Sequence, residues 1–102
     1  MSNETPQPIS NAEVPAASGL SDEMIARSLA DSGEHIAQFF SFAHLPMKLA
    51  NVSRPFAHMA AEIVLCLPRN PERTVALRKL LESKDAAVRC YIAKDVVRPE
   101  VR

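Results

Sequence analysis

Two adjacent residues in the carboxyl-terminal half of the chain have side chains that could hold a phosphate group. Arg73 and Thr74 follow Asn70-Pro71-Glu72, a sequence typical of a helix start, with Asn70 as the N-cap and Pro71 in the first turn. A guanidinium, a hydroxyl and the backbone N–H groups of a helix N-terminus together favour phosphate binding. Pro71 has no N–H, which removes one of these backbone donors.

The same predicted helix carries a second cation, Lys84, on its apolar side. At 100° per residue, Arg73 and Lys84 fall close in angle to Leu77 and Tyr91. Two cations on a core-facing stripe need a compensating partner. One explanation is an anion bound where helices or subunits meet. The other is structural: Arg73 extends its charged end to solvent, and Lys84 pairs with a carboxylate such as Glu62 across the hairpin.

The sequence contains no residue pattern typical of catalysis or of metal binding. Its three histidines lie 9 and 14 residues apart, and no cysteine accompanies them at ligand spacing. Glycine-rich phosphate loops and a nucleophile elbow are also absent. We therefore expect no enzyme activity, no catalytic residue, no metal site and no cofactor. Cys66 and Cys90 are expected to be buried or interfacial thiols in a reducing cytoplasm.

Two long helices must position these residues. Apolar residues recur every three or four positions over residues 46–67 and again over 71–94. Pro55 lies within the first stretch, where we expect a kink or a new helix start at Ser53. The connecting loop is short, so the two helices should be antiparallel neighbours.

A shorter helix is expected over residues 22–31. Ser21 is a suitable N-cap, and Gly33 suits the C′ position after the helix end. The Phe-rich segment 34–45 is compatible with a short helix or a packed loop.

The remaining segments complete the expected domain organisation. Residues 1–20 are rich in proline and small polar residues, which favours a disordered arm. Residues 21–97 form the helical hairpin domain, and residues 98–102 should fray. Only 2 glycines are present, too few for the tight turns of a β-rich fold. The sequence thus predicts an all-α protein built on an antiparallel helical hairpin with a short N-terminal helix.

Helix length and residue placement indicate self-association. Two helices of about 20 residues bury little apolar surface as a monomer. In addition, Leu65, Val75 and Cys90 point away from the main apolar stripes. We therefore expect the hairpin to assemble into a homo-oligomer.

The charge distribution limits the possible partners. Residues 1–35 have six acids and one arginine, and residues 36–102 have 11 basic residues and six acids, so the net charge is zero. A neutral total argues against binding to duplex nucleic acid, whereas the basic part permits a small anionic ligand. No apolar run reaches about 18 residues and no signal peptide is evident, so we expect no membrane partner and a cytoplasmic location.

Several short motifs resemble those of a known family. Leu67-Pro68, Glu72-Arg73-Thr74 and the run from Ala76 to Leu80 match a pattern of Cys-Pro, Glu-Arg-Ser/Thr and Ala-Leu-x-Lys-Leu. Upstream, residues 40–44 are similar to an aromatic-x-aromatic-x-His-Pro element. These patterns belong to the small phage anti-CBASS and anti-Thoeris proteins with a helical-hairpin domain. The resemblance covers roughly residues 39–93.

This resemblance implies a function and a set of ligand-binding residues. Proteins of this family form symmetric oligomers, commonly hexamers, that bind their ligands and catalyse no reaction. They bind cyclic oligonucleotide second messengers of bacterial immunity and hold them away from effectors. Arg73 and Thr74 match positions expected to hold phosphate or base edges, and Phe42 matches an aromatic, usually Tyr, that stacks on a base. A basic residue that contacts phosphate aligns with Ser53, and Arg54 follows one place later.

We therefore expect a phage anti-defence sponge for cyclic di- or trinucleotides in the host cytoplasm. Its phosphate contacts would be Arg73, Arg54 and Lys84. The alternative is a structural or protein-binding hairpin oligomer without nucleotide binding. Such a protein would act as an assembly factor or as a direct inhibitor of a host defence protein.

Overall fold

The computed structural model describes residues 19–93. In chain order its elements are α1 (Asp22–Ala30), η3 (His35–Phe40), α2 (Met47–Cys66) and α3 (Pro71–Ile92), where η3 is a 3₁₀ helix. No strand occurs in this part of the chain, so the all-α prediction is confirmed. Most of the expected arm, residues 1–18, lies outside the described residues. So do residues 94–97 of the expected domain and the tail 98–102.

Both helices for which an N-cap was expected begin as their sequences indicate. The Ser21 hydroxyl accepts a hydrogen bond from the Met24 backbone N–H at 3.1 Å. The Asn70 side chain accepts one from the Arg73 backbone N–H at 3.0 Å, with Pro71 in the first turn. These caps satisfy backbone donors that have no partner inside the helix.

The turn after α1 differs by one position from the expectation. The C-cap is Asp31, so Gly33 lies two residues beyond it instead of one. Gly33 has φ of +79°, a left-handed conformation that other residues adopt only with strain.

α2 runs without interruption through Pro55, so, of the expected kink or new helix start at Ser53, the new start is wrong and the kink stays a prediction. Proline cannot donate a hydrogen bond to the carbonyl four residues earlier, which belongs to Asn51. Asn51 and Pro55 both lie on the exposed side of α2, where water can bind the freed carbonyl.

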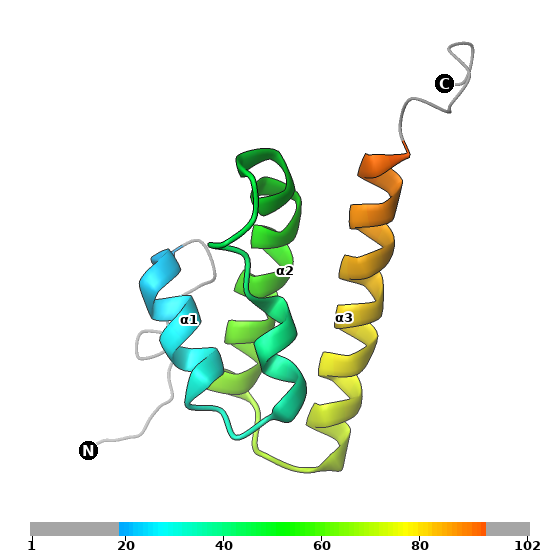
Figure 1. Cartoon of the computed structure of the whole chain (residues 1–102). Helices are drawn as coiled ribbons and strands as arrows, with labels where there is room; N and C mark the ends of the chain where they lie inside the picture. The colour runs from blue at the N-terminus through cyan, green and yellow to red at the C-terminus, as the bar shows by residue number, and fades with distance from the viewer. Residues whose placement is uncertain (1–18, 94–102) are drawn as a thin grey trace.

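α2 and α3 lie side by side and run in opposite directions, joined by residues 67–70 (Figure 1). α1 packs on α2, and η3 contacts each of the three α-helices. The buried residues of α2 are all small, which allows its neighbours to approach closely: Ala50, Ser53, Ala57, Ala60 and Ala61. Ile25, Phe40 and Leu77 are the largest apolar side chains that this core buries completely.

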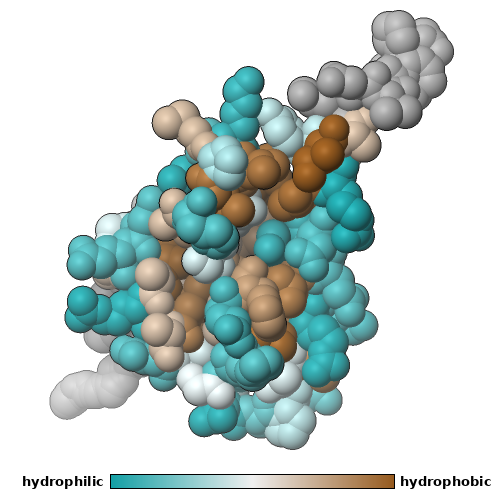
Figure 2. Space-filling view, in the orientation of Figure 1, coloured by the Kyte–Doolittle hydropathy of each residue, from teal (hydrophilic) through white to brown (hydrophobic). Residues whose placement is uncertain are grey.

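The far end of the α2–α3 pair is open. The buried residues of α3 are Arg73 and Leu77, both near its beginning. At the other end, Met47 is 77% exposed and Ile92 is 63% exposed. Apolar surface gathers toward the top of Figure 2, where α2 begins and α3 ends. This open end leaves apolar side chains of both helices in contact with solvent.

Two other expectations concern the outer faces of the helices. Leu65 and Val75 are 43% and 40% exposed, as their positions off the main stripes predicted. Cys66 and Cys90 were expected to be buried or interfacial; both are exposed in the single chain, so the first alternative is wrong and the second stays a prediction. In the described residues, no helix combines the length and hydropathy needed to cross a membrane.

Candidate functional site

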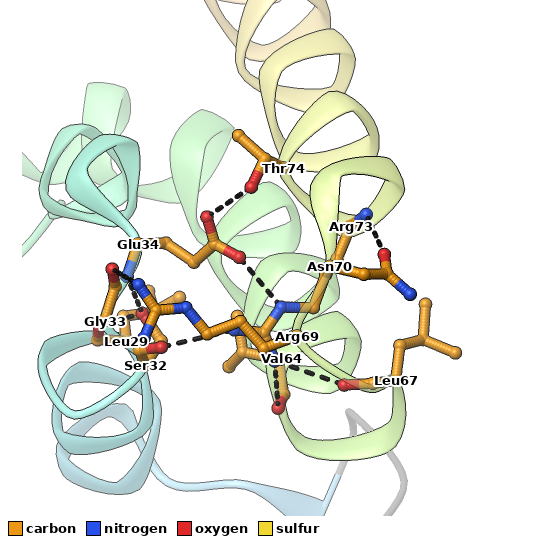
Figure 3. Close-up of polar contacts among 10 residues, drawn as sticks. All are labelled: Leu29, Ser32, Gly33, Glu34, Val64, Leu67, Arg69, Asn70, Arg73 and Thr74. Atoms are coloured by element: carbon orange, nitrogen blue, oxygen red, sulfur yellow. Dashed lines mark hydrogen bonds and ion pairs between the residues drawn. The ribbon is translucent and has the colours of Figure 1, made fainter.

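Arg73 lies in a buried polar cluster where the turn after α1 meets the α2–α3 turn (Figure 3). Its Nε donates a hydrogen bond to Glu34 Oε2 at 2.8 Å, and Nη2 donates to the Ser32 carbonyl at 3.2 Å. Nη1 donates to the carbonyl oxygens of Val64 and Leu67, at 3.3 and 3.1 Å. The side chains of Arg73 and Glu34 are only 6% and 4% exposed. The guanidinium therefore joins three separate segments of the chain.

Glu34 is the anion at the centre of this cluster. Thr74 Oγ1 donates to Glu34 Oε1 at 2.8 Å, so both carboxylate oxygens accept a short hydrogen bond. Burial alone would raise the pKa of Glu34, but hydrogen bonds from Arg73 and Thr74 and the charges of Arg73 and Arg69 together lower it. Glu34 is therefore ionised at neutral pH.

Arg69 fixes the same turn from its outer side. Its Nη2 donates to the Gly33 carbonyl at 2.9 Å. A Cβ atom on Gly33 would lie 2.6 Å from Arg69 Nη1, so the absence of a side chain allows this close approach.

The structure thus brings the expected anion-binding pair, Arg73 and Thr74, to one place, where an internal carboxylate already binds them. The structural explanation in which Arg73 extends to solvent is wrong, because the side chain is buried and directed to Glu34 and backbone carbonyls. Sequence reasoning missed Glu34. The only signal was a cation on an apolar stripe, which requires a partner without identifying it.

Phe42 and Arg54, the other two expected ligand contacts, also lie together. The Arg54 guanidinium carbon is 5.0 Å from the centroid of the Phe42 ring, a distance typical of a cation–π contact. Arg54 Nη1 donates to Asn51 Oδ1 at 3.0 Å. Its Nε and Nη2 donate to the two oxygens of Asp22, at 3.3 and 3.2 Å.

A groove of about 480 Å³ lies beside this contact, between α1 and η3. Its apolar lining includes Ile25, Leu29, Phe40 and Phe42, and Asp22 is one of its polar residues. Arg54 is not itself a lining residue of the groove, but its guanidinium contacts two residues that are, Asp22 and Phe42.

Ser53, which the sequence resemblance pairs with a basic residue, is less suited to ligand contact than Arg54. Ser53 is buried, and its hydroxyl has no hydrogen-bond partner within the described chain. Arg54 keeps 39% of its side chain exposed. Of the two adjacent residues, Arg54 is therefore the one that an anion in solvent can reach.

Lys84 stands apart from the other four residues. Its Nζ pairs with Oδ1 of Asp85, the next residue on the same helix, at 3.3 Å. The expected partner across the hairpin, Glu62, is therefore wrong. Lys84 follows Arg73 by 11 positions, which separates their backbones by about 16 Å along α3. One phosphate group cannot contact both side chains across that distance without a large change in structure.

Comparison with protein-family models, curated proteins and solved structures finds no match for this chain. Any functional proposal therefore depends on the residues themselves and on their geometry. Within residues 19–93, no three or more His, Cys, Asp or Glu side chains come together as a metal site would require.

Proposed function

We propose that this protein is a non-enzymatic phage sponge that binds cyclic di- or trinucleotide second messengers of bacterial immunity. It would sequester them in the host cytoplasm. The observation that carries this proposal is the contact of Arg54 with Phe42 at the edge of an apolar groove. We choose the ligand class from the short-motif resemblance of residues 39–93 described in the sequence analysis.

The two side chains supply the two kinds of contact that a cyclic nucleotide needs. The groove has the size of a small-molecule pocket, and Phe42 lines it. Phe42 is 6% exposed and Arg54 lies over its ring, so a base in the groove would contact the remaining accessible part of that ring. Base–aromatic stacking contributes about 1–3 kcal/mol per base. The exposed guanidinium of Arg54 would bind a phosphate oxygen of the same ligand.

Arg73 and Thr74 have a different place in this proposal. They would contact a ligand only if its phosphate replaced the Glu34 carboxylate, which is buried and held by short hydrogen bonds. We therefore assign Arg54 and Phe42 to direct contact and Arg73 and Thr74 to the stability of the turn beside the groove.

Sequestration requires many binding sites, because a sponge lowers the free messenger concentration by mass action. The concentration of sites must therefore be comparable to that of the messenger. A small chain that assembles into a homo-oligomer meets this need. The apolar side chains at the open end of α2 and α3, including Met47 and Ile92, are suited to such an assembly.

Native mass spectrometry with a panel of cyclic di- and trinucleotides tests the proposal. We expect a homo-oligomer that gains whole ligand masses, with the bound ligand recovered chemically unchanged. Arg54→Ala should weaken binding at least tenfold. Arg78→Ala removes an equal charge from an exposed position on α3 and should leave affinity unchanged. An oligomer that takes up no cyclic nucleotide contradicts the proposal.

The contacts of Glu34 favour a second candidate function. Because an internal carboxylate already binds Arg73 and Thr74, the hairpin is also compatible with a structural or protein-binding oligomer that holds no nucleotide. Such a protein would be an assembly factor or a direct inhibitor of a defence protein. Failure of every cyclic nucleotide to bind, with the oligomer intact, would favour this alternative.

A further inference from the structure

Asp22 binds Arg54 in the way that a phosphate would. Arg54 Nε donates to Asp22 Oδ1 at 3.3 Å, and Nη2 donates to Oδ2 at 3.2 Å. Arginine uses this two-pronged geometry for both carboxylates and phosphates. The carboxylate therefore occupies the same donors that the proposed site would offer to a ligand.

The Asp22–Arg54 pair can be exchanged at small cost. Both distances exceed the about 2.7–2.9 Å typical of charge-assisted hydrogen bonds. The side chains of Arg54 and Asp22 are 39% and 54% exposed, so water and salt weaken their attraction. An incoming anion at Arg54 would replace a weak contact.

The Glu34–Arg73 pair provides a contrast within the same protein. It also ties the segment before α2 to the hairpin, but its atoms are 2.8 Å apart and its side chains are 6% exposed or less. Breaking this pair would leave an uncompensated buried charge. Of these two arginine–carboxylate pairs in residues 19–93, the one at Arg54 is therefore suited to reversible exchange.

Exchange at Arg54 needs little movement of the backbone. Ile25 and Leu29 anchor α1 in the core, at 0% and 6% exposure, whereas Asp22 is an exposed residue in the first turn. Arg54 would stay oriented without Asp22, because it also lies over Phe42 and donates to Asn51 Oδ1. Rotation of the Asp22 side chain into solvent is enough to free the two donors.

We propose that Asp22 is an internal competitor that gates Arg54 against phosphate-bearing ligands. This inference rests on the proposed function and concerns the regulation of the same site. Asp22→Asn removes the competing charge and its repulsion of the ligand. Exposed ion pairs of this kind correspond to about a two- to fivefold change in affinity.

Inorganic pyrophosphate is a suitable probe, with the Arg54 Nε–H signal followed by NMR. We expect Asp22→Asn to bind pyrophosphate about two- to fivefold more tightly than the native chain. Glu23→Gln is the matched control, because it removes an equal charge from an exposed position in the same turn. Its affinity should equal that of the native chain. Equal affinities of Asp22→Asn and Glu23→Gln, or an Arg54 signal that does not respond in any variant, overturn the gate.

The same variants, tested against the cyclic nucleotide panel, separate the gate from the proposed function. If pyrophosphate gives the expected difference and no cyclic nucleotide binds, the gate stands and the sponge function fails. If cyclic nucleotides bind the native chain and Asp22→Asn equally, the sponge function stands and the gate is overturned. The helical circular dichroism signal of both variants should match that of the native chain.

Discussion

Glu34 Oε2 and Arg73 Nε lie 2.8 Å apart across 39 positions of sequence and form an ion pair that is almost completely buried. The pair fixes the turn after α1 to the start of α3. Thr74 and backbone carbonyls complete its hydrogen bonds, so the charges are compensated without solvent. This contact joins the segment between α1 and η3, which borders the groove, to the hairpin.

Removal of Glu34 should destabilise the fold. Glu34→Ala leaves the Arg73 guanidinium buried without its counter-charge, which costs about 3 kcal/mol in the free energy of unfolding. Urea denaturation monitored by circular dichroism measures this difference. Glu23→Ala, at an exposed position, should change the free energy of unfolding by less than about 0.5 kcal/mol. If both substitutions change the free energy of unfolding equally, the buried ion pair adds no stability beyond that of an exposed glutamate.

Stability should fall at acidic pH because of the same carboxylate. The folded-state pKa of Glu34 lies below its ordinary value of 4.5, so the folded state binds its proton less readily than the unfolded state. The contribution of Glu34 is complete above that ordinary value. It is lost as pH falls toward the folded-state pKa. Urea midpoints measured between neutral and acidic pH should decline less steeply for Glu34→Gln than for the native chain. Parallel pH profiles would contradict this assignment.

Gly33 should resist substitution because of its backbone and its neighbour. Gly33→Ala forces a side chain into φ of +79° and places Cβ 2.6 Å from Arg69 Nη1. The left-handed conformation alone costs about 1–2 kcal/mol. Thermal or urea unfolding of Gly33→Ala, Arg69→Ala and the double variant separates the two causes. Gly33→Ala should lower the free energy of unfolding by less when Arg69 is already replaced with alanine. If the effects of the two substitutions simply add, the contact between Cβ and Arg69 contributes nothing.

Association of the chains should depend on apolar residues outside the main core. Leu65 and Val75 are 43% and 40% exposed in the single chain, so replacing both with Gln should leave its fold intact. If the homo-oligomer covers them, the double variant should dissociate at higher protein concentrations than the native chain. Light scattering coupled to size-exclusion chromatography measures the change, with Arg78→Gln as the exposed control. An unchanged oligomer would place the interface elsewhere, for example at the open end with Met47 and Ile92.

The helices and their capped starts could be predicted from the order of the amino acids alone. Helix caps and apolar periodicity involve residues no more than about four positions apart, so Ser21, Asn70 and the stripes can be recognised without a structure. This is why the all-α class and most helix ends were predicted closely. Phe42 and Arg54 were also selected from the sequence, through a resemblance and not through any local physical signal.

The partners of the buried and half-buried polar groups became evident from the folded arrangement of these helices. No local pattern links Glu34 to Arg73 or Asp22 to Arg54, because the partners lie 39 and 32 positions apart and meet only after α1 packs on the hairpin. The passage of α2 through Pro55 also depends on packing, since contacts of one helix face with its neighbours stabilise the helix despite one missing hydrogen bond. Helix caps form between residues that are close in sequence, so they can be predicted from it. The partner of a buried charge depends on which distant segments pack together in the core.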